Sequence, residues 1–268
     1  DPIPERYAFL AVEETPDTVD ENAAVILSVD VADRKLLGDL DEPYGGRVAL
    51  AIDHHIMHRS FAKACCLYPK AAAACEIVYA IAKELPVKLT PQIATCLYTG
   101  MATDTGCFQF DNVTPHTLRI VADLMEQFPE IHYAWINRAM FAVKSMGRLR
   151  VEQKLIDQLH TSCNGKGVMI CITLAFMEQY GLDPLDLDGL AGFPLQVEGA
   201  EVGITLKERD PNVFKVSMRS ARTVDVAAIC KEFGGGGHIK AAGCLIEGTA
   251  ESVMQRLQTA VERSLVES

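Results

Sequence analysis

The sequence lacks any apolar run near the roughly 20 residues that a membrane-spanning helix needs. No signal peptide is visible, and the sequence begins at Asp1. Nine cysteines are present, but no Cys-x-x-Cys pair occurs among them. Their odd number and their apolar surroundings favour buried, reduced thiols over disulfides, and their dispersal disfavours a zinc hydrolase with cysteine ligands. These absences predict a cytoplasmic protein without a membrane anchor.

Basic residues are also scarce, since 25 Lys and Arg stand against 36 Asp and Glu, which gives a net charge of −11. A broad surface for duplex nucleic acid needs positive patches over the phosphates and is therefore disfavoured. A short or small phosphorylated ligand in a local basic pocket stays compatible with this charge. The length of 268 residues and the hydrophobic content of 49% suit one large globular domain or two ordinary ones.

Two apolar segments near the beginning of the chain are followed by acids or histidines. Residues 23–33 (AAVILSVDVAD) and 47–55 (RVALAIDHH) have the length and β-branched content of buried strands. Open α/β sheets bind ligands at the carboxyl ends of their parallel strands. The two segments therefore predict polar side chains gathered at one edge of a parallel sheet.

The rest of the chain reads as helices followed by a second group of strands. Two helices open with Thr-Pro, a capping residue followed by proline at the first helical position. The predicted helices of the first part cover residues 71–85, 90–106, 114–128 and, as one long or kinked helix, 136–160. The later segments are strands at 165–174, a hairpin at 201–220 around Asp-Pro-Asn, a helix at 224–233, a strand from 241 and a helix at 251–265.

These patterns predict an α/β fold with two domains. We expect a parallel-sheet domain with a metal site at residues 1–145, a helical connector at 146–163, and a smaller α/β substrate-binding domain at 164–268.

Polar groups that can bind metal end three apolar segments: Asp30, the run Asp53-His54-His55, and Asp104. A single Asp in such a place is more often a turn cap, and adjacent histidines are more often a partly buried polar pair. Three such places in one chain favour a site for divalent ions, with Mn favoured over Mg or Zn by the mixed oxygen and nitrogen donors. Two ions about 3.5–4 Å apart can generate hydroxide and clamp a phosphate.

These motifs resemble those of the DHH phosphoesterases, in the branch with an appended DHH-associated C-terminal domain. The resemblance spans essentially the whole chain and rests on VDVAD (29–33), AIDHH (51–55), MATDTGCFQF (101–110) and FGGGGHIKAAG (233–243). It is nearest to the oligoribonuclease and phosphoadenosine-phosphate phosphatase types. It implies a hydrolase for very short RNA, for 3′,5′-bisphosphonucleosides such as pAp, or for linear products of cyclic dinucleotides. Pyrophosphate and polyphosphate are less expected, because relatives that act on them carry a different C-terminal lobe.

The resemblance also implies the roles of individual residues around two divalent ions. Asp30 would be shared by both ions, His54 would bind one ion and Asp104 the other. Asp53 would orient His54 from behind, as metal-bound histidines usually need. His55 would face the scissile phosphate or its metal-bound water.

The second lobe would supply a substrate clamp. Backbone N–H groups of a glycine run can approach an anion closely, an imidazole can donate to a phosphate oxygen, and an arginine offers a bidentate fork or a stacking plane. The glycine run by itself is compatible with a plain flexible loop, and Arg222 is left open between a substrate contact and a solvated charge. The residues expected to bind substrate are Arg219, Ser220, Gly235, Gly236, Gly237 and His238.

Two features depart from the family pattern. Relatives open with a strand and a His-x-x-Pro-Asp-x-Asp type segment that completes the metal site, and nothing like it precedes Asp30. We expect roughly 50 residues of such a domain to be missing, either from the sequence or from the protein. The second feature is His58, which we interpret as a surface histidine, with a substrate contact or a spare ligand as alternatives.

The missing opening segment motivates an alternative function, a catalytically incomplete nucleotide-binding or regulatory module. A homodimer is expected by family analogy alone.

Overall fold

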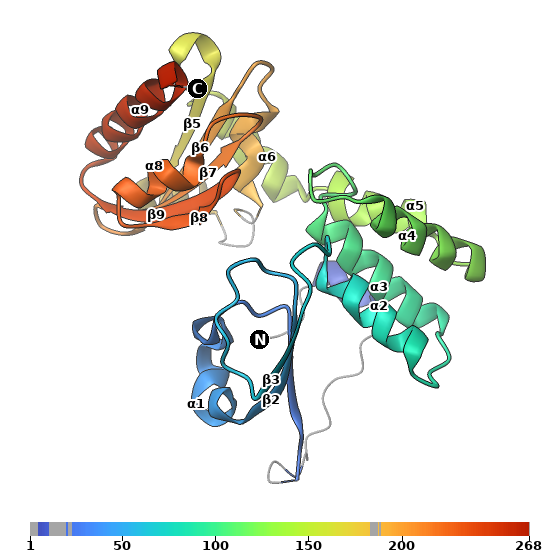
Figure 1. Cartoon of the computed structure of the whole chain (residues 1–268). Helices are drawn as coiled ribbons and strands as arrows, with labels where there is room; N and C mark the ends of the chain where they lie inside the picture. The colour runs from blue at the N-terminus through green and yellow to red at the C-terminus, as the bar shows by residue number, and fades with distance from the viewer. Residues whose placement is uncertain (1–4, 11–19, 21–22, 183–186, 188, 268) are drawn as a thin grey trace. The chain divides into compact units, whose positions relative to one another are not determined.

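The computed structural model describes residues 5–10, 20, 23–182, 187 and 189–267. The chain divides into two compact units, Asp1–Val143 and Lys144–Ser268, and each unit contains its own sheet (Figure 1). The predicted α/β class is confirmed. The assignment of a metal-binding and a substrate-binding role to these parts stays a prediction.

A small parallel sheet positions the DHH motif in the first unit. Its strands, in the order β1-β2-β3, are β1 (Ile26–Val29), β2 (Val48–Asp53) and β3 (Ala64–Leu67). The two predicted strands are confirmed as parallel neighbours, with Leu27 opposite Leu50, so their carboxyl ends lie at one edge. Three short helical segments accompany the sheet, namely η2 (Arg34–Leu40), α1 (Asp41–Tyr44) and η3 (Gly45–Arg47), whereas η1 (Glu5–Leu10) packs against α3.

The helices of the first unit are α2 (Ala74–Glu84), α3 (Pro91–Asp104), α4 (Pro115–Gln127) and α5 (Tyr133–Asn137). Both predicted Thr-Pro openings are confirmed, since the Oγ1 atoms of Thr90 and Thr114 accept the N–H groups of Ile93 and Thr117. The core between the helices is apolar and includes Leu97, Met101, Ile120, Leu124 and Ile136. This packing fixes α3, whose last residue is Asp104.

The long helix predicted over residues 136–160 is wrong. The chain forms a π-helical turn, η4 (Arg138–Ala142), becomes extended at Val143, and starts a new helix, α6 (Met146–Ile156), at the cap Ser145. The α6 side chains Val151 and Leu155 are fully buried against the core of the second unit. Residues 146–156 are therefore part of that unit and do not form a separate connector.

The second unit is built on a six-stranded sheet of order β4-β5-β6-β7-β9-β8. Its strands are β4 (His160–Ser162), β5 (Gly167–Ile172), β6 (Val202–Asp210), β7 (Val213–Ser220), β8 (Gly236–His238) and β9 (Ala241–Glu247). The predicted hairpin is confirmed as β6 and β7, which pair antiparallel around the turn at Asn212. The glycine run is not a loop throughout, because part of it forms the edge strand β8.

Helices cover this sheet in two places. One face buries Val216 and Met218 against Val253 and Leu257, in a core shared with α8 (Val226–Glu232) and α9 (Ala250–Glu267). On β5, residues of the other face such as Ile170 pack with α6, α7 (Leu174–Tyr180) and η7 (Leu190–Gln196). A short segment, η5 (Cys163–Gly165), joins β4 to β5.

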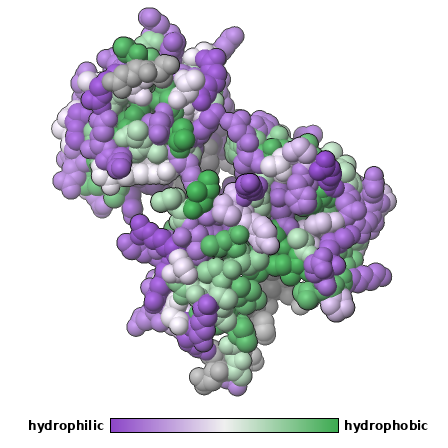
Figure 2. All heavy atoms as spheres, viewed as in Figure 1, coloured by the Kyte–Doolittle hydropathy of each residue, from purple (hydrophilic) through white to green (hydrophobic). Residues whose placement is uncertain are grey.

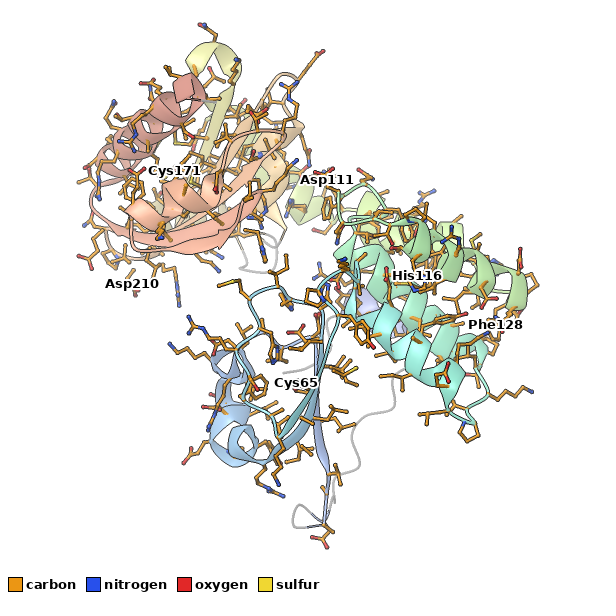
Figure 3. All side chains as sticks on the ribbon, viewed as in Figure 1. Cys65, Asp111, His116, Phe128, Cys171 and Asp210 are labelled. Atoms are coloured by element: carbon orange, nitrogen blue, oxygen red, sulfur yellow. The ribbon has the colours of Figure 1, made fainter. Side chains whose placement is uncertain are left out.

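The surface of the first sheet is partly apolar, and most of the cysteines are at least partly exposed. No helix in the described parts of the chain is long and apolar enough to cross a bilayer. Apolar residues gather on the surface over the first sheet, among them Val25, Leu27 and Val29 (Figure 2). All nine cysteines are free, but only two of them are buried, so the expectation of buried thiols is wrong for the others, including Cys65 on β3 and Cys171 on β5 (Figure 3).

Candidate functional site

Asp30 directly follows β1 and turns sharply into the site. Its φ of 63° is left-handed, a conformation that Asp adopts more readily than most residues. Its N–H donates to the carbonyl of Ile52 at 2.9 Å, which anchors the turn to β2. The carboxylate lies beside the DHH motif, with Oδ1 3.3 Å from Nε2 of His54 and 3.7 Å from Nδ1 of His55. The two predicted strand ends therefore meet.

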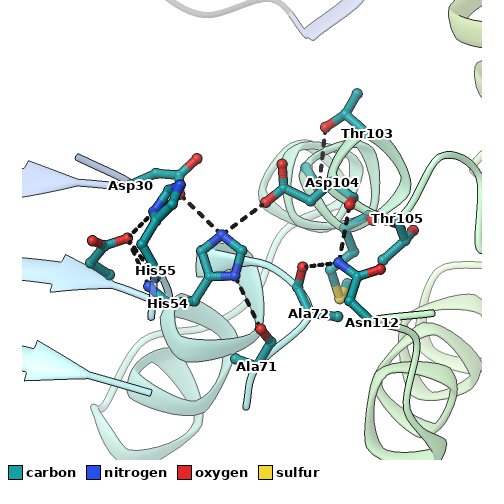
Figure 4. A network of polar contacts seen from close by, with 12 residues as sticks. Asp30, His54, His55, Ala71, Ala72, Thr103, Asp104, Thr105 and Asn112 are labelled. Atoms are coloured by element: carbon teal, nitrogen blue, oxygen red, sulfur yellow. Dashed lines mark hydrogen bonds and ion pairs between the residues drawn. The ribbon is translucent and has the colours of Figure 1, made fainter. Parts of the chain in front are cut away.

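The His54 ring is held from the side opposite Asp30. Its Nδ1 donates to the carbonyl of Ala71 at 3.0 Å, which leaves Nε2 as the atom that faces the acids (Figure 4). Nε2 is 3.3 Å from Asp30 Oδ1 and 3.6 Å from Asp104 Oδ2. A backbone carbonyl behind the ring and carboxylates in front of it form the usual setting of a metal-binding histidine.

Asp104 is placed by the turn that ends α3. Residues 106–108 are all left-handed, and the buried Thr105 braces them by donating to Met101 O and accepting the N–H of Phe108. Asn112 Nδ2 donates to the carbonyls of Asp104 and of Ala72, at 3.1 and 3.0 Å. Asn112 thus ties this turn to the loop that supplies the His54 contact, a role that the sequence analysis missed because no motif or periodicity marks it.

The carboxylates beside His54 favour the binding of a cation. Burial is the main cause that raises the pKa of Asp104, and the neighbouring Asp30 carboxylate adds to it. The hydrogen bond to Asp30 is the main cause that raises the pKa of His54 to about 9. Two carboxylates and an imidazole nitrogen therefore surround a place that favours positive charge. Ligand atoms of Asp30, His54 and His55 lie within 4.8 Å of one another, and this donor set suits a divalent ion.

Asp53 is fully buried and accepts four hydrogen bonds, three from the DHH motif and one from His58. Its Oδ1 accepts the N–H of His54 (2.7 Å), the N–H of His55 (3.2 Å) and Nδ1 of His55 (2.7 Å), and its Oδ2 accepts Nδ1 of His58 (2.7 Å). Burial acts to raise the pKa of Asp53, but the hydrogen bonds from His55, His58 and the backbone outweigh it and lower the pKa to about 2. The carboxylate is therefore ionised and acts only as an acceptor.

Two predictions about this motif need correction. Asp53 was expected to orient the ring of His54, but it reaches only the backbone of His54, because the Ala71 carbonyl already occupies the ring nitrogen on that side. His58 was expected at the surface, yet its side chain is only 2% exposed, because Asp53 draws it inward.

In the second unit, Arg219 and His238 lie on the same face of the sheet. Arg219 is opposite Ala241 in the β7–β9 register, and Ala241 is opposite His238 in the β9–β8 register. Residues opposite each other in antiparallel strands share a face, so only the small Ala241 separates the two side chains. A Cβ on Gly237 would lie 2.5 Å from the carbonyl oxygen of Ala241, so that position requires glycine.

Ser220 does not join this face. Neighbouring residues of a strand point to opposite sides, and Ser220 is buried on the side away from Arg219. Its hydroxyl has no hydrogen-bond partner among the described residues. The prediction that Ser220 adds a donor beside Arg219 is therefore wrong. Arg222 is largely exposed and forms an ion pair with Glu201, which favours a structural role for it.

The chain is similar to known proteins over most of its length. The DHHA1 domain matches residues 168–267. The chain is 31% identical over 256 residues to the bifunctional oligoribonuclease and PAP phosphatase NrnA of Thermus thermophilus, covering 94% of the chain and 75% of the relative. It is 25% identical to the protein of the same name from Bacillus subtilis, covering 96% and 82%.

Among solved structures, an exopolyphosphatase-related protein from Bacteroides fragilis superposes with a TM-score of 0.80 at 24% identity, over 89% of the chain and 71% of that structure. At this identity the superposition supports the fold alone.

Proposed function

Since the chain belongs to the DHH phosphoesterases with a DHHA1 domain, in the branch of the bifunctional oligoribonucleases and PAP phosphatases, it is a phosphate-ester hydrolase. We propose that it cleaves di- to pentanucleotides and removes phosphate from 3′,5′-bisphosphonucleosides such as pAp. The observation that carries this proposal is the convergence of Asp30 and Asp104 on Nε2 of His54. Linear dinucleotides derived from cyclic dinucleotides are a further candidate substrate.

We assign the hydrolytic residues to the first unit. Asp30, His54 and Asp104 would hold divalent ions, with Mn favoured by the mixed donors. Such ions supply a nucleophilic hydroxide and neutralise charge on the phosphoryl oxygens when they are bound. Asp53 holds Nδ1–H of His55, so Nε2 of the neutral ring is an acceptor that can take a proton from the attacking water, and once protonated it can donate to the phosphate. At 33% exposure, the His55 ring is open to a substrate.

We assign nucleotide binding to the exposed face of β7, β9 and β8. Arg219 offers a fork for a terminal phosphate, and His238 offers a further donor two strands away. Between them Ala241 presents only a methyl group, which leaves room for the sugar or the base. The edge strand β8 consists of Gly236, Gly237 and His238, so its backbone can approach an anion closely.

The nine free cysteines support a reducing compartment, and we propose the cytoplasm. The homodimer stays a prediction.

A substrate panel tests the proposal. With Mn2+ fixed in excess, we expect release of mononucleotide from a dinucleotide and of phosphate from pAp, with kcat/KM at least about tenfold above that for a long single strand or for pyrophosphate. The release is measured by chromatography of the products, and a chelator provides the blank. Tight nucleotide binding without any turnover would instead support the regulatory module.

Arg219→Ala should raise KM for pAp by about 10- to 100-fold, because a hydrogen-bonded contact with a charged group is worth about 1.5–3 kcal/mol. A contact made equally in the ground and transition states changes KM and leaves kcat nearly unchanged. Arg219→Lys should restore only part of the loss, since it keeps the charge without the fork. The matched control is Arg209→Ala at the exposed end of β6. An unchanged KM in Arg219→Ala would remove this residue from the binding surface.

A further inference from the structure

The carboxylate of Asp53 bridges two imidazoles, and only one of them, His55, belongs to the DHH motif. We propose that the other one, His58, is a positioning residue for hydrolysis. It fixes the Asp53 carboxylate, which in turn aims the ring of His55. This inference rests on the proposed function, because it takes His55 as the group that meets the phosphate.

The two oxygens of the Asp53 carboxylate accept hydrogen bonds from different donors. Among the residues that the structure describes, Oδ2 accepts a hydrogen bond only from Nδ1 of His58, whereas Oδ1 accepts from Nδ1 of His55 and from the backbone N–H groups of His54 and His55. The carboxylate torsion of an Asp side chain is soft and roughly two-fold. Without a donor on Oδ2, the carboxylate of Asp53 is held through Oδ1 alone and can turn about this torsion, so the ring of His55 is aimed less precisely.

His58 is itself held in place, as a positioning group must be. Its side chain is 2% exposed, and its ring stacks on Phe61 with centroids 5.8 Å apart and planes inclined by 25°. Its Nε2 lies 3.9 Å from Sγ of Cys65, which in turn lies 3.5 Å from Oγ of Ser60. Because Asp53 can only accept, His58 carries its proton on Nδ1 and presents Nε2 as an acceptor towards the thiol.

Substitution of His58 by Asn and by Gln distinguishes a role in positioning Asp53 from a role in packing alone. The amide nitrogen of Asn takes the place of Nδ1 in a histidine ring, and that of Gln takes the place of Nε2. His58→Asn therefore keeps the donor to Asp53, whereas His58→Gln moves the donor towards Cys65 and leaves Oδ2 without one. A role in packing alone would favour the larger Gln over Asn, so the two hypotheses predict opposite orders.

The experiment compares kcat and KM of the two variants on a dinucleotide, with His116→Asn, an exposed histidine on α4, as the control. Loss of a partner that orients a site residue typically costs 10- to 100-fold, so we expect kcat of His58→Gln to fall by about this factor with little change in KM. His58→Asn should stay within about threefold of the unmodified protein. The reverse order, or full activity of folded His58→Gln, would overturn the proposal.

A second readout does not depend on turnover or on the folding of any variant. In the unmodified protein labelled with 15N-histidine and saturated with diamagnetic Mg2+, NMR should find the proton of His58 on Nδ1. A His58 ring without a proton on Nδ1 would overturn the proposal even if the protein is active. If the protein cleaves no phosphate ester, the proposed function fails, and this measurement still decides whether His58 holds Asp53.

Discussion

Asp104→Asn is expected to lower kcat/KM for a dinucleotide by at least about 10³-fold. The carboxamide keeps the shape of the side chain but removes the negative charge that lies 3.6 Å from Nε2 of His54. Stabilisation by a bound divalent ion is worth several kcal/mol in the transition state, and about 4 kcal/mol corresponds to 10³-fold in rate. The loss should appear in kcat/KM for dinucleotides and for pAp alike, because both reactions would use the same ions.

Calorimetric titration with Mn2+ checks the cause of this loss. We expect weaker or fewer Mn2+ binding events in Asp104→Asn, and unchanged binding in the control Asp39→Asn, whose side chain lies on the exposed segment η2. Circular dichroism verifies that both variants are folded. If Asp104→Asn retained its activity and its Mn2+ affinity, Asp104 would not be a ligand, and the hydrolytic site would have to lie elsewhere.

The meeting of Asp30 with the DHH motif could be predicted from the sequence for a simple reason. Both follow apolar runs that read as parallel strands, and the carboxyl ends of such strands share an edge. Asp104 is different, because it ends a helix, and helical periodicity says nothing about which strand a helix end will approach. It was grouped with Asp30 and the DHH motif because it also ends an apolar segment, and only its role as the ligand of a second ion came from the family resemblance.

The supporting contacts could not be predicted, because they come from irregular segments. The carbonyl of Ala71 and the amide of Asn112 are brought to the site by loops, whose course follows no period. His58 lies three residues beyond the motif, and its inward direction depends on the buried charge of Asp53. Ser220 is a different case, because strand alternation with Arg219 would have placed it on the opposite face. The predicted connector helix failed because Ser145 was not read as a helix cap, although its side chain accepts the N–H of Arg148 at the start of α6.

The second large effect is expected from Glu201→Gln, which should lower the free energy of unfolding of the second unit by about 3 kcal/mol. The carboxylate is buried and accepts the N–H groups of Arg222 (3.0 Å), Thr223 (2.7 Å) and Val224 (3.4 Å), as well as Nε of Arg222 (3.1 Å). Breaking a buried hydrogen-bonded charge costs about 3–5 kcal/mol. Because the Arg222 side chain is 74% exposed, most of the loss comes from the backbone donors.

Urea unfolding followed by circular dichroism measures this effect, with hydrogen exchange of the β6 and β7 amides to locate it. The single tryptophan, Trp135, lies in the first unit, so its fluorescence does not report on these strands directly. Glu198→Gln, an exposed residue three positions earlier, is the matched control. A loss below about 0.5 kcal/mol, the usual size for a surface substitution, would contradict the assigned role of Glu201.

The stabilisation that Glu201 provides should depend on pH, which tests the same prediction in a second way. Burial acts to raise the pKa of Glu201, but the backbone N–H of Thr223 and the contacts with Arg222 outweigh it, so the pKa in the folded protein lies below its usual value of 4.5. A carboxyl group with a lowered pKa stabilises the fold above its unfolded pKa and loses this contribution as the pH falls through the folded pKa. The difference in stability between the unmodified protein and Glu201→Gln should therefore be full near pH 7 and shrink below about pH 4.5.

The turn that Glu201 holds directly follows β7, so the loss of this carboxylate also loosens the strand that carries Arg219. In Glu201→Gln, KM for pAp should therefore rise at temperatures where the second unit begins to open.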